Sequence, residues 1–421
     1  MSAGETLVFK PWAWAVFILA VLMAGLWAGH DKLVEPRKLA TTDRPGSISI
    51  DCGVNEDYMD EQSGIHYESD SEFVTAGLNN VVSPQYILDN PQLGPMLKTL
   101  RSFPEGNKSC YHLKPEQGKG HHYMFRAFFL YGNYDGLQQP PTFDLYLGVN
   151  FWANVKLDID GTSWDYEIIQ FLSTDTIDVC LVNNDSGIPI ISGLELRLLK
   201  DSIYQIESKA LLLQFRYDVM RGYYWSRYKD DVYDRPWDHF TFSKARLIQT
   251  RANMDIQVNN SNYGIPMEIL GTAAQPLNHW DSLKYSQHNL GWDLYVYFHF
   301  AEIVNTTEDQ RREISITLND VKLTPITLEY LKTLSVGPQN ISSDGFVNFS
   351  INATAESTLP PLLNAFEVYA AASFLESPTY LVDGTYTVSN PPRESAARAS
   401  SAQFNGEFLR PFSCLPFQLL L

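Results

Sequence analysis

Seven side chains, in three places along the sequence, have the chemistry that sugar recognition needs. Flat aromatic faces stack on the C–H-rich side of a pyranose ring, and nearby carboxylates and amides bond its hydroxyls. HYESD supplies one pair, the turn-like string YGNYDG supplies four more, and a tryptophan follows the apolar run FDLYLGVN. The candidate ligand-binding residues are Tyr67, Asp70, Tyr131, Asn133, Tyr134, Asp135 and Trp152. In the alternative interpretation, the two YGNYDG tyrosines only fix a β-turn and pack on a sheet edge.

Patterns typical of catalysis or metal binding do not accompany these residues. Neither G-x-S-x-G, H-E-x-x-H nor C-x-x-C occurs. Asp158-x-Asp160-Gly161 lacks the further oxygen ligands of a calcium loop. We therefore predict no catalytic residues, no metal and no cofactor, and hence no enzyme. A wall-modifying hydrolase that uses two carboxylates is the less favoured alternative.

A third feature is a string of mixed charges, which contains Arg227, Asp230, Asp231, Asp234 and Arg235. Opposite charges so close together are more typical of a salt-bridged linker or domain junction than of a binding site. We expect an interface role for this string.

Composition limits the class of partner. The chain has 421 residues, 44% of them hydrophobic and 19% charged, so most of it can form a packed core. With 31 Lys and Arg against 49 Asp and Glu, the formal net charge is −18. Such a charge repels phosphate backbones, and nucleic acid is therefore not an expected partner.

The N-terminal segment predicts export. Residues 12–29 are 18 uncharged, mostly apolar residues that follow Lys10. They are typical of a signal peptide, or of a signal anchor if uncleaved. Either way, the rest of the chain is predicted to enter the secretory pathway and to be secreted, exposed at the cell surface or held at the membrane. Seven glycosylation sequons agree with export and begin at Asn107, Asn184, Asn259, Asn305, Asn340, Asn348 and Asn352.

Four cysteines suit an oxidising compartment with one or two disulfides. They are Cys52, Cys110, Cys180 and Cys414. Their spacing does not determine the pairing.

Alternating apolar and polar residues predict an all-β fold. Apolar side chains occupy every second position from Phe143 to Phe151, from Leu194 to Leu198 and from Ile314 to Leu318. Helical patterns are short, around 83–88 and 93–100. Short strands separated by turn residues are typical of a β-sandwich.

An internal repeat divides the chain. The segment 125–130 is echoed by 296–301, and the strand that ends at Leu147 by the one that ends at Leu318, both at an offset of 171. A third match follows at an offset of 172. We predict one domain at 46–200, a linker at 201–219 and a second domain at 220–372. Residues 373–421, poor in periodic apolar residues, are predicted to be a disordered tail.

Several strings identify a family resemblance. They are SIDCG, LRSFP, CY, YGNYDG, FDLYLG, VCLV, LELR, RYKDDVYDR and STLPPLLNA. In this order and spacing they resemble the tandem malectin-like ectodomain of plant leucine-rich-repeat receptor kinases, over roughly residues 46–372. The resemblance implies two tandem jelly-roll-like β-sandwich (malectin-like) domains, related to a carbohydrate-binding lectin. It also implies a disulfide between Cys110 and Cys180.

The resemblance implies a non-catalytic extracellular recognition module, receptor-like in origin. The expected ligand is a carbohydrate, a cell-wall fragment or a peptide, and a membrane receptor or co-receptor is an expected partner. The sequence contains no leucine-rich-repeat period, second spanning run or kinase motif. The alternative function is therefore that of a truncated receptor-kinase ectodomain, acting as a decoy or without independent function.

Overall fold

The computed structural model describes residues 46–89, 94–206, 209–220, 226–227, 229, 231–254, 263–291, 293–342 and 345–374. The predicted leader at 12–29, Asn259, Cys414 and residues 375–421 of the predicted tail lie outside these ranges. None of the helices within them is both long and apolar enough to cross a membrane.

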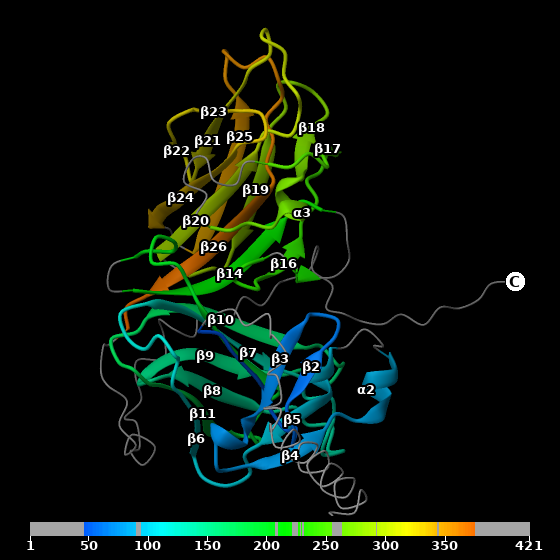
Figure 1. Ribbon diagram of the computed structural model, residues 1–421, viewed down its shortest axis with the longest axis vertical. Helices are drawn as coiled ribbons and strands as arrows, with labels where there is room; N and C mark the ends of the chain where they lie inside the picture. The colour runs from blue at the N-terminus through cyan, green and yellow to red at the C-terminus, as the bar shows by residue number, and fades with distance from the viewer. Residues whose placement is uncertain are drawn as a thin grey trace, which may run out of the picture. The chain divides into compact units, whose positions relative to one another are not determined.

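The first half of the chain is a sandwich of two main sheets (Figure 1). One sheet contains, in spatial order, β2 (Tyr58–Asp60), β3 (Ile65–Ser69), β1 (Ile48–Asp51), β13 (Gly193–Leu198), β7 (His122–Phe129) and β10 (Trp164–Phe171). The facing sheet contains β6 (Lys108–Leu113), β11 (Ile177–Ser186), β8 (Thr142–Leu147) and β9 (Asn150–Lys156). A small third sheet contains β12 (Ile190–Ile191), β5 (Thr99–Ser102) and β4 (Leu78–Val81).

The helices of the first half are short. They are η1 (Asp70–Glu72), α2 (Pro84–Asp89) and η2 (Pro95–Lys98), so the two helical patterns in the sequence coincide with α2 and η2. The apolar run 143–151 forms two strands instead of one. Gly148, at a φ of 61°, makes the turn between β8 and β9.

The second half repeats this arrangement. Its first sheet contains β14 (Ala210–Asp218), β26 (Ala365–Ala372), β20 (Asp293–Ala301) and β24 (Thr333–Ser342), with β16 (Pro236–His239) and β15 (Ser226–Arg227) beside β14. The facing sheet contains β19 (Leu283–His288), β25 (Phe346–Ala353), β21 (Arg312–Leu318), β22 (Val321–Lys322) and β23 (Ile326–Leu328). β17 (Ala245–Gln249) pairs with β18 (Thr272–Pro276), and α3 (Met267–Leu270) precedes β18.

Equivalent strands of the two halves pair in the same way, in agreement with the sequence repeat. β1 pairs with β13, which pairs with β7, and β14 pairs with β26, which pairs with β20, in each case antiparallel. A parallel partner lies beside β1 and β14 alike, namely β3 and β16. The fold is thus all-β and tandem, as predicted.

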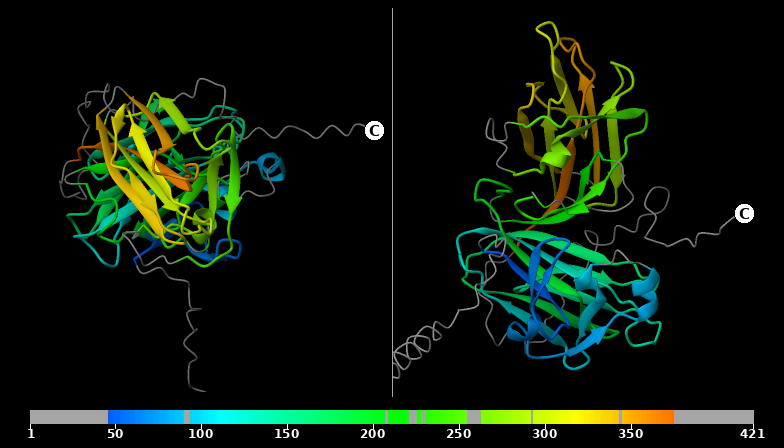
Figure 2. Two further views of the ribbon diagram at one scale, coloured as in Figure 1. Left: turned by 90° about the horizontal axis from the view of Figure 1, so that it is seen from above. Right: turned by 45° about the vertical axis from the view of Figure 1, so that its right-hand side comes forward.

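The predicted linker at 201–219 contains strand β14. β14 pairs with β10 of the first half and with β26 of the second, so the first sheets of the two halves form one 12-stranded sheet (Figures 1 and 2). β14 lacks a clean alternation in sequence because its first four residues, Ala210 to Leu213, are all apolar, and the first two are buried on opposite faces. The exact domain boundaries stay a prediction.

Apolar side chains form a separate core in each half. The first core is built around residues such as Phe125, Leu145 and Leu196, all fully buried. The second is built around their counterparts Val296, Ile316 and Val368, of which Ile316 is 2% exposed and the others fully buried. The alternation that predicts the strands is therefore the alternation that fills the sandwiches.

A disulfide joins Cys110 on β6 to Cys180 on β11. The two residues are direct cross-strand partners, with Cα atoms 4.0 Å apart. The pairing implied by the family resemblance is confirmed. Cys52 is buried and carries a free thiol.

Candidate functional site

A row of buried charges crosses the joined sheet and is the most polar region of its interior. We call it the charge row; from the first half to the second it contains Glu195, Arg126, Glu167, Arg216 and Glu367. Each member is at most 3% exposed. Glu195, Arg126 and Glu167 are register partners on β13, β7 and β10, and Arg216 faces Glu367 across β14 and β26. Acid and base therefore alternate from strand to strand, which satisfies each charge.

Ionic pairing keeps the acids of the charge row ionised. Desolvation opposes ionisation of Glu167, but the charges of Arg216 and Arg126 outweigh it and lower its pKa. Desolvation is likewise outweighed at Glu367, where Arg216 and a hydrogen bond from His299 hold the pKa well below its usual range. Carboxylates whose pKa is lowered by ion pairing stay ionised, so they are better suited to stabilising the fold than to transferring protons.

The mixed-charge string of the sequence lies over the charge row. Arg227 contacts Glu195 at 3.0 Å and pairs with Asp234, which also accepts from Arg197 Nη2 at 2.7 Å. Further along, Arg235 pairs with Asp231 at 3.0 Å. The predicted junction role holds for these residues of the string, while Asp230 lies outside the described ranges.

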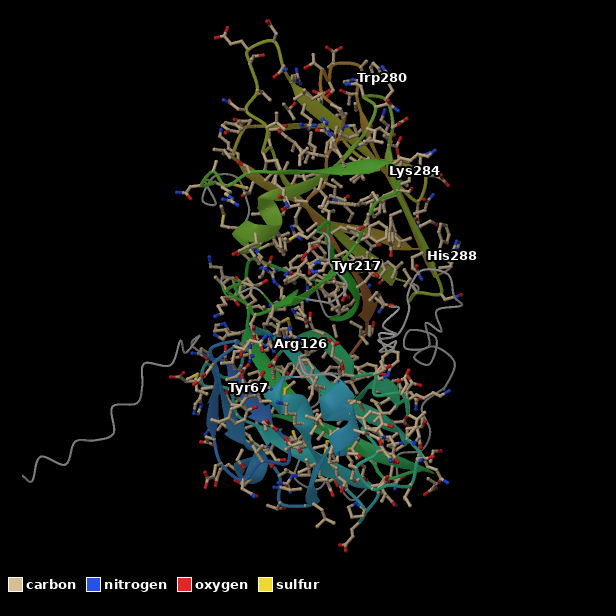
Figure 3. All side chains as sticks on the ribbon, turned by 90° about the vertical axis from the view of Figure 1, so that its right-hand side faces the viewer. Tyr67, Arg126, Tyr217, Trp280, Lys284 and His288 are labelled. Atoms are coloured by element: carbon tan, nitrogen blue, oxygen red, sulfur yellow. A yellow bond between two sulfur atoms is a disulfide. The ribbon has the colours of Figure 1, made fainter. Side chains whose placement is uncertain are left out.

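The Tyr67 and Asp70 side chains are buried. Tyr67 is 3% exposed, stacks on Tyr58 and donates to Glu195 Oε1 at 2.7 Å; Figure 3 shows it near Arg126. Asp70 is fully buried, and both its oxygens accept from Arg101 at 2.5 Å. In this structure neither side chain is available to an external ligand. Trp152 is 2% exposed and belongs to the first core.

The YGNYDG string forms a turn that is partly exposed. Tyr131 is 1% exposed and donates to Asp135 Oδ1 at 2.6 Å, so it fixes the turn as the alternative interpretation predicts. Tyr134 packs edge-on against Tyr131 and is half-buried. Asn133 is half-buried and Asp135 exposed, and neither Asn133 Nδ2 nor Asp135 Oδ2 has a hydrogen-bond partner among the described residues.

Exposed apolar side chains occur near this turn, and sequence analysis did not find them. Leu78 and Val81 of β4 are 59% and 60% exposed, and Leu137 is 63% exposed. The turn contacts the end of β4 directly, because Ser83 N donates to Gly132 O at 2.9 Å. A Cβ on Gly132 would lie 2.3 Å from Val82 Cγ1, so only glycine permits this close approach. Leu78 lies on the opposite face of β4 from Val81, because side chains alternate along a strand. We call the set Val81, Asn133, Tyr134, Asp135 and Leu137 the β4 surface.

The sequons differ in exposure. Asn107, Asn305, Asn340 and Asn348 are exposed, whereas Asn184 and Asn352 are half-buried. Asn348 and Asn352 both lie on the solvent face of β25, since Val347, Phe349 and Ile351 between and beside them are buried. Figure 3 shows Lys284 and His288 of the neighbouring strand β19 on the same side as Trp280, which is 72% exposed.

No group of three or more His, Cys, Asp or Glu side chains within the described ranges is arranged to hold a metal ion.

Family comparison agrees with this architecture. The model of the malectin-like domain matches residues 50–371. The chain belongs to the malectin-like domain family. A leucine-rich repeat receptor-like protein kinase of Arabidopsis thaliana is 39% identical over 344 residues, which cover 80% of this chain and 39% of that one. A second Arabidopsis kinase of this type is 38% identical over 348 residues, with the same coverage. The chain thus spans about two fifths of the length of these malectin-like relatives.

Solved structures share the malectin-like fold at low identity. The extracellular domain of ANXUR2 from Arabidopsis thaliana gives a TM-score of 0.61 at 15% identity, over 79% of this chain and 99% of that one. The plant receptor-like kinase FER gives 0.60 at 17% identity, over 77% and 96%. In a further structure, FER is in complex with the peptide RALF23 and with LLG2; it gives 0.59 at 15% identity, over 78% and 95%.

Proposed function

We propose that this chain is a non-catalytic extracellular recognition module, receptor-like in origin, which binds its ligand at the β4 surface. The carrying observation is the exposure of Val81 and Leu137 beside a turn with exposed polar groups. Neighbouring exposed apolar side chains on a soluble protein mark interaction sites.

The chemistry of the β4 surface suits a carbohydrate, a cell-wall fragment or a peptide. Tyr134 offers an aromatic ring, and Asn133 and Asp135 offer a donor and an acceptor for hydroxyls or main-chain amides. The structural relative in complex with RALF23 and LLG2 supports a peptide ligand and a co-receptor as partners of the same general kind. Secretion or display at the cell surface, by cleavage or retention of residues 12–29, is part of the proposal.

Binding to wall-glycan and peptide arrays tests the proposal. The secreted protein should bind at least one array member, and Val81→Ser with Tyr134→Ala should weaken that binding at least tenfold. Val321→Ser is the matched control, because Val321 is equally exposed, at 60%, in the second half. Equal loss in the control, or no loss in the β4 variant, would place the ligand elsewhere.

A wall-modifying hydrolase is the competing activity, and one residue makes it testable. Desolvation, and next the charge of Asp165, raise the pKa of Asp238 to about 6, which is the property of a candidate general acid. Release of sugar from a wall glycan, abolished by Asp238→Asn, would replace the binding proposal. The non-catalytic proposal predicts no release from either protein.

A further inference from the structure

The repeat makes β10 and β24 equivalent strands. β10 pairs with β7, and β24 pairs with β20, the counterpart of β7. Phe125 and Met124 of β7 correspond, at the offset of 171, to Val296 and Tyr295 of β20. The outer edges of β10 and β24 are therefore the same edge of the repeated unit.

In the first half this edge is where the next unit attaches. Ile168 and Ile169 of β10 pair with Leu212 and Leu211 of β14. Three of these residues are at most 2% exposed, and Leu212 is partly buried. A strand of the second unit thus extends the sheet of the first.

In the second half the same positions carry different residues. Phe125 and Met124 pair with Ile168 and Ile169, whereas Val296 and Tyr295 pair with Gln339 and Asn340. Asn340 therefore takes the place of Ile169, and Gln339 that of Ile168. Within the described residues the sheet ends at β24, and Asn340 is exposed.

Asn340 begins the sequon Asn340-Ile341-Ser342. Asn340 Nδ2 donates to Asp293 Oδ1 at 3.0 Å, and Asp293 also pairs with Lys209. A glycosylated amide keeps one N–H, so this hydrogen bond and the glycan are compatible. The first residue of the sequon therefore lies at one of the two repeat positions that, in the first half, pair with β14.

An unpaired edge strand invites a strand from another chain. In another copy of the chain β14 is already paired on both sides, so the strand available for pairing is β2 or β24, the outer strands of the described sheet. We propose that an N-linked glycan on Asn340 caps the β24 edge and prevents an outer strand of another copy of this chain from pairing with it. This cap rests on the proposed passage through the secretory pathway.

Two substitutions at one residue separate the glycan from the side chain that bears it. Ser342→Ala destroys the sequon but keeps Asn340, and Ser342→Thr keeps both. Each protein, secreted from eukaryotic cells, is measured by sedimentation over a hundredfold range of concentration. We expect Ser342→Thr to stay monomeric, and the average mass of Ser342→Ala to rise with concentration to twofold or more.

Further variants keep the test decisive. Asn348→Gln, which removes a sequon from a sheet face instead of an edge, should stay monomeric. Asn340→Lys removes the sequon but places a charge on the edge, and it should also stay monomeric. A monomeric Ser342→Ala at every concentration would overturn the proposal.

Mass mapping of the secreted wild-type protein distinguishes failure of the cap from failure of the export proposal. Occupied Asn340 supports the cap. Occupied Asn348 with bare Asn340 overturns the cap and leaves export standing. If no described sequon is occupied, both proposals fall.

Discussion

At the scale of single residues, two of the seven candidate ligand-binding side chains are held by hydrogen-bond partners remote in sequence. The Tyr67 hydroxyl donates to Glu195, which is 128 residues away in sequence. Asp70 accepts from Arg101, which is 31 residues away. Sequence reasoning selected these side chains by their chemical groups. It could not assign their exposure, because a carboxylate beside a tyrosine has the same local pattern whether an arginine or water faces it.

Asp51 is a buried acid whose protonation should couple to stability. Burial raises its pKa from 3.8 to about 7, and hydrogen bonds from Tyr58 and Thr99 only partly oppose that rise. Between these values the folded protein binds more protons than the unfolded chain. The stabilisation is complete below about pH 4 and is lost as the pH rises through 7, by an amount on the order of 4 kcal/mol at about 1.4 kcal/mol per pKa unit.

Urea unfolding at several pH values measures this coupling. Asp51→Asn should reduce the fall in unfolding free energy between about pH 4 and about pH 7. The difference between wild type and variant isolates Asp51 from the other acids of the chain. Parallel stability curves for the two proteins would show that Asp51 titrates normally.

At the scale of elements, alternating apolar residues predicted an all-β fold, and the echoed segments predicted its repeat. The correspondence of β7 with β20 and of β13 with β26 agrees with those echoes. β14 was not predicted, because it begins with four successive apolar residues and shows no one-sided pattern there. The β4 surface was not predicted either, because the sequence alone does not show whether a Leu or Val side chain is exposed or buried.

Replacing Arg126 should lower the free energy of unfolding, because its side chain pairs with acids on both strands that neighbour β7. Arg126 on β7 pairs with Glu167 on β10 at 2.9 Å and with Glu195 on β13 at 2.8 Å. Arg126→Leu leaves buried carboxylates short of a partner, and we expect a loss of about 3–5 kcal/mol in unfolding free energy.

Arg311 provides the comparison for Arg126. It pairs with Glu313 at the surface, with its side chain 51% exposed, and Arg311→Leu should cost no more than about 1 kcal/mol. Similar losses for both variants, measured by urea unfolding, would mean that burial does not set the strength of the charge row.

At the scale of the whole molecule, the joined sheet should make the two halves unfold together. Ile169 on β10 and Leu211 on β14 are buried where the halves meet, at 2% and 1% exposure. We expect one thermal transition for the wild-type protein. Ile169→Asp buries an unpaired charge at this joint and should separate the transition into two.

Gln339→Asp lies one position before the counterpart of Ile169 on the β24 edge and keeps the Asn340 sequon, and it should leave a single transition. Calorimetry distinguishes these results. Two transitions in the wild type, or one in Ile169→Asp, would show that the joint does not couple the halves.

The placement of β14 also limits how this protein can be divided. A fragment that stops at residue 200 would retain β10 but lose its outer neighbour, and would bare Ile168 and Ile169 to solvent. A fragment that starts at residue 220 would lose the strand beside β26. Neither half is therefore a self-sufficient building block when cut at those points, and a gene duplication that produced this pair must have transferred the connecting strand with its second copy.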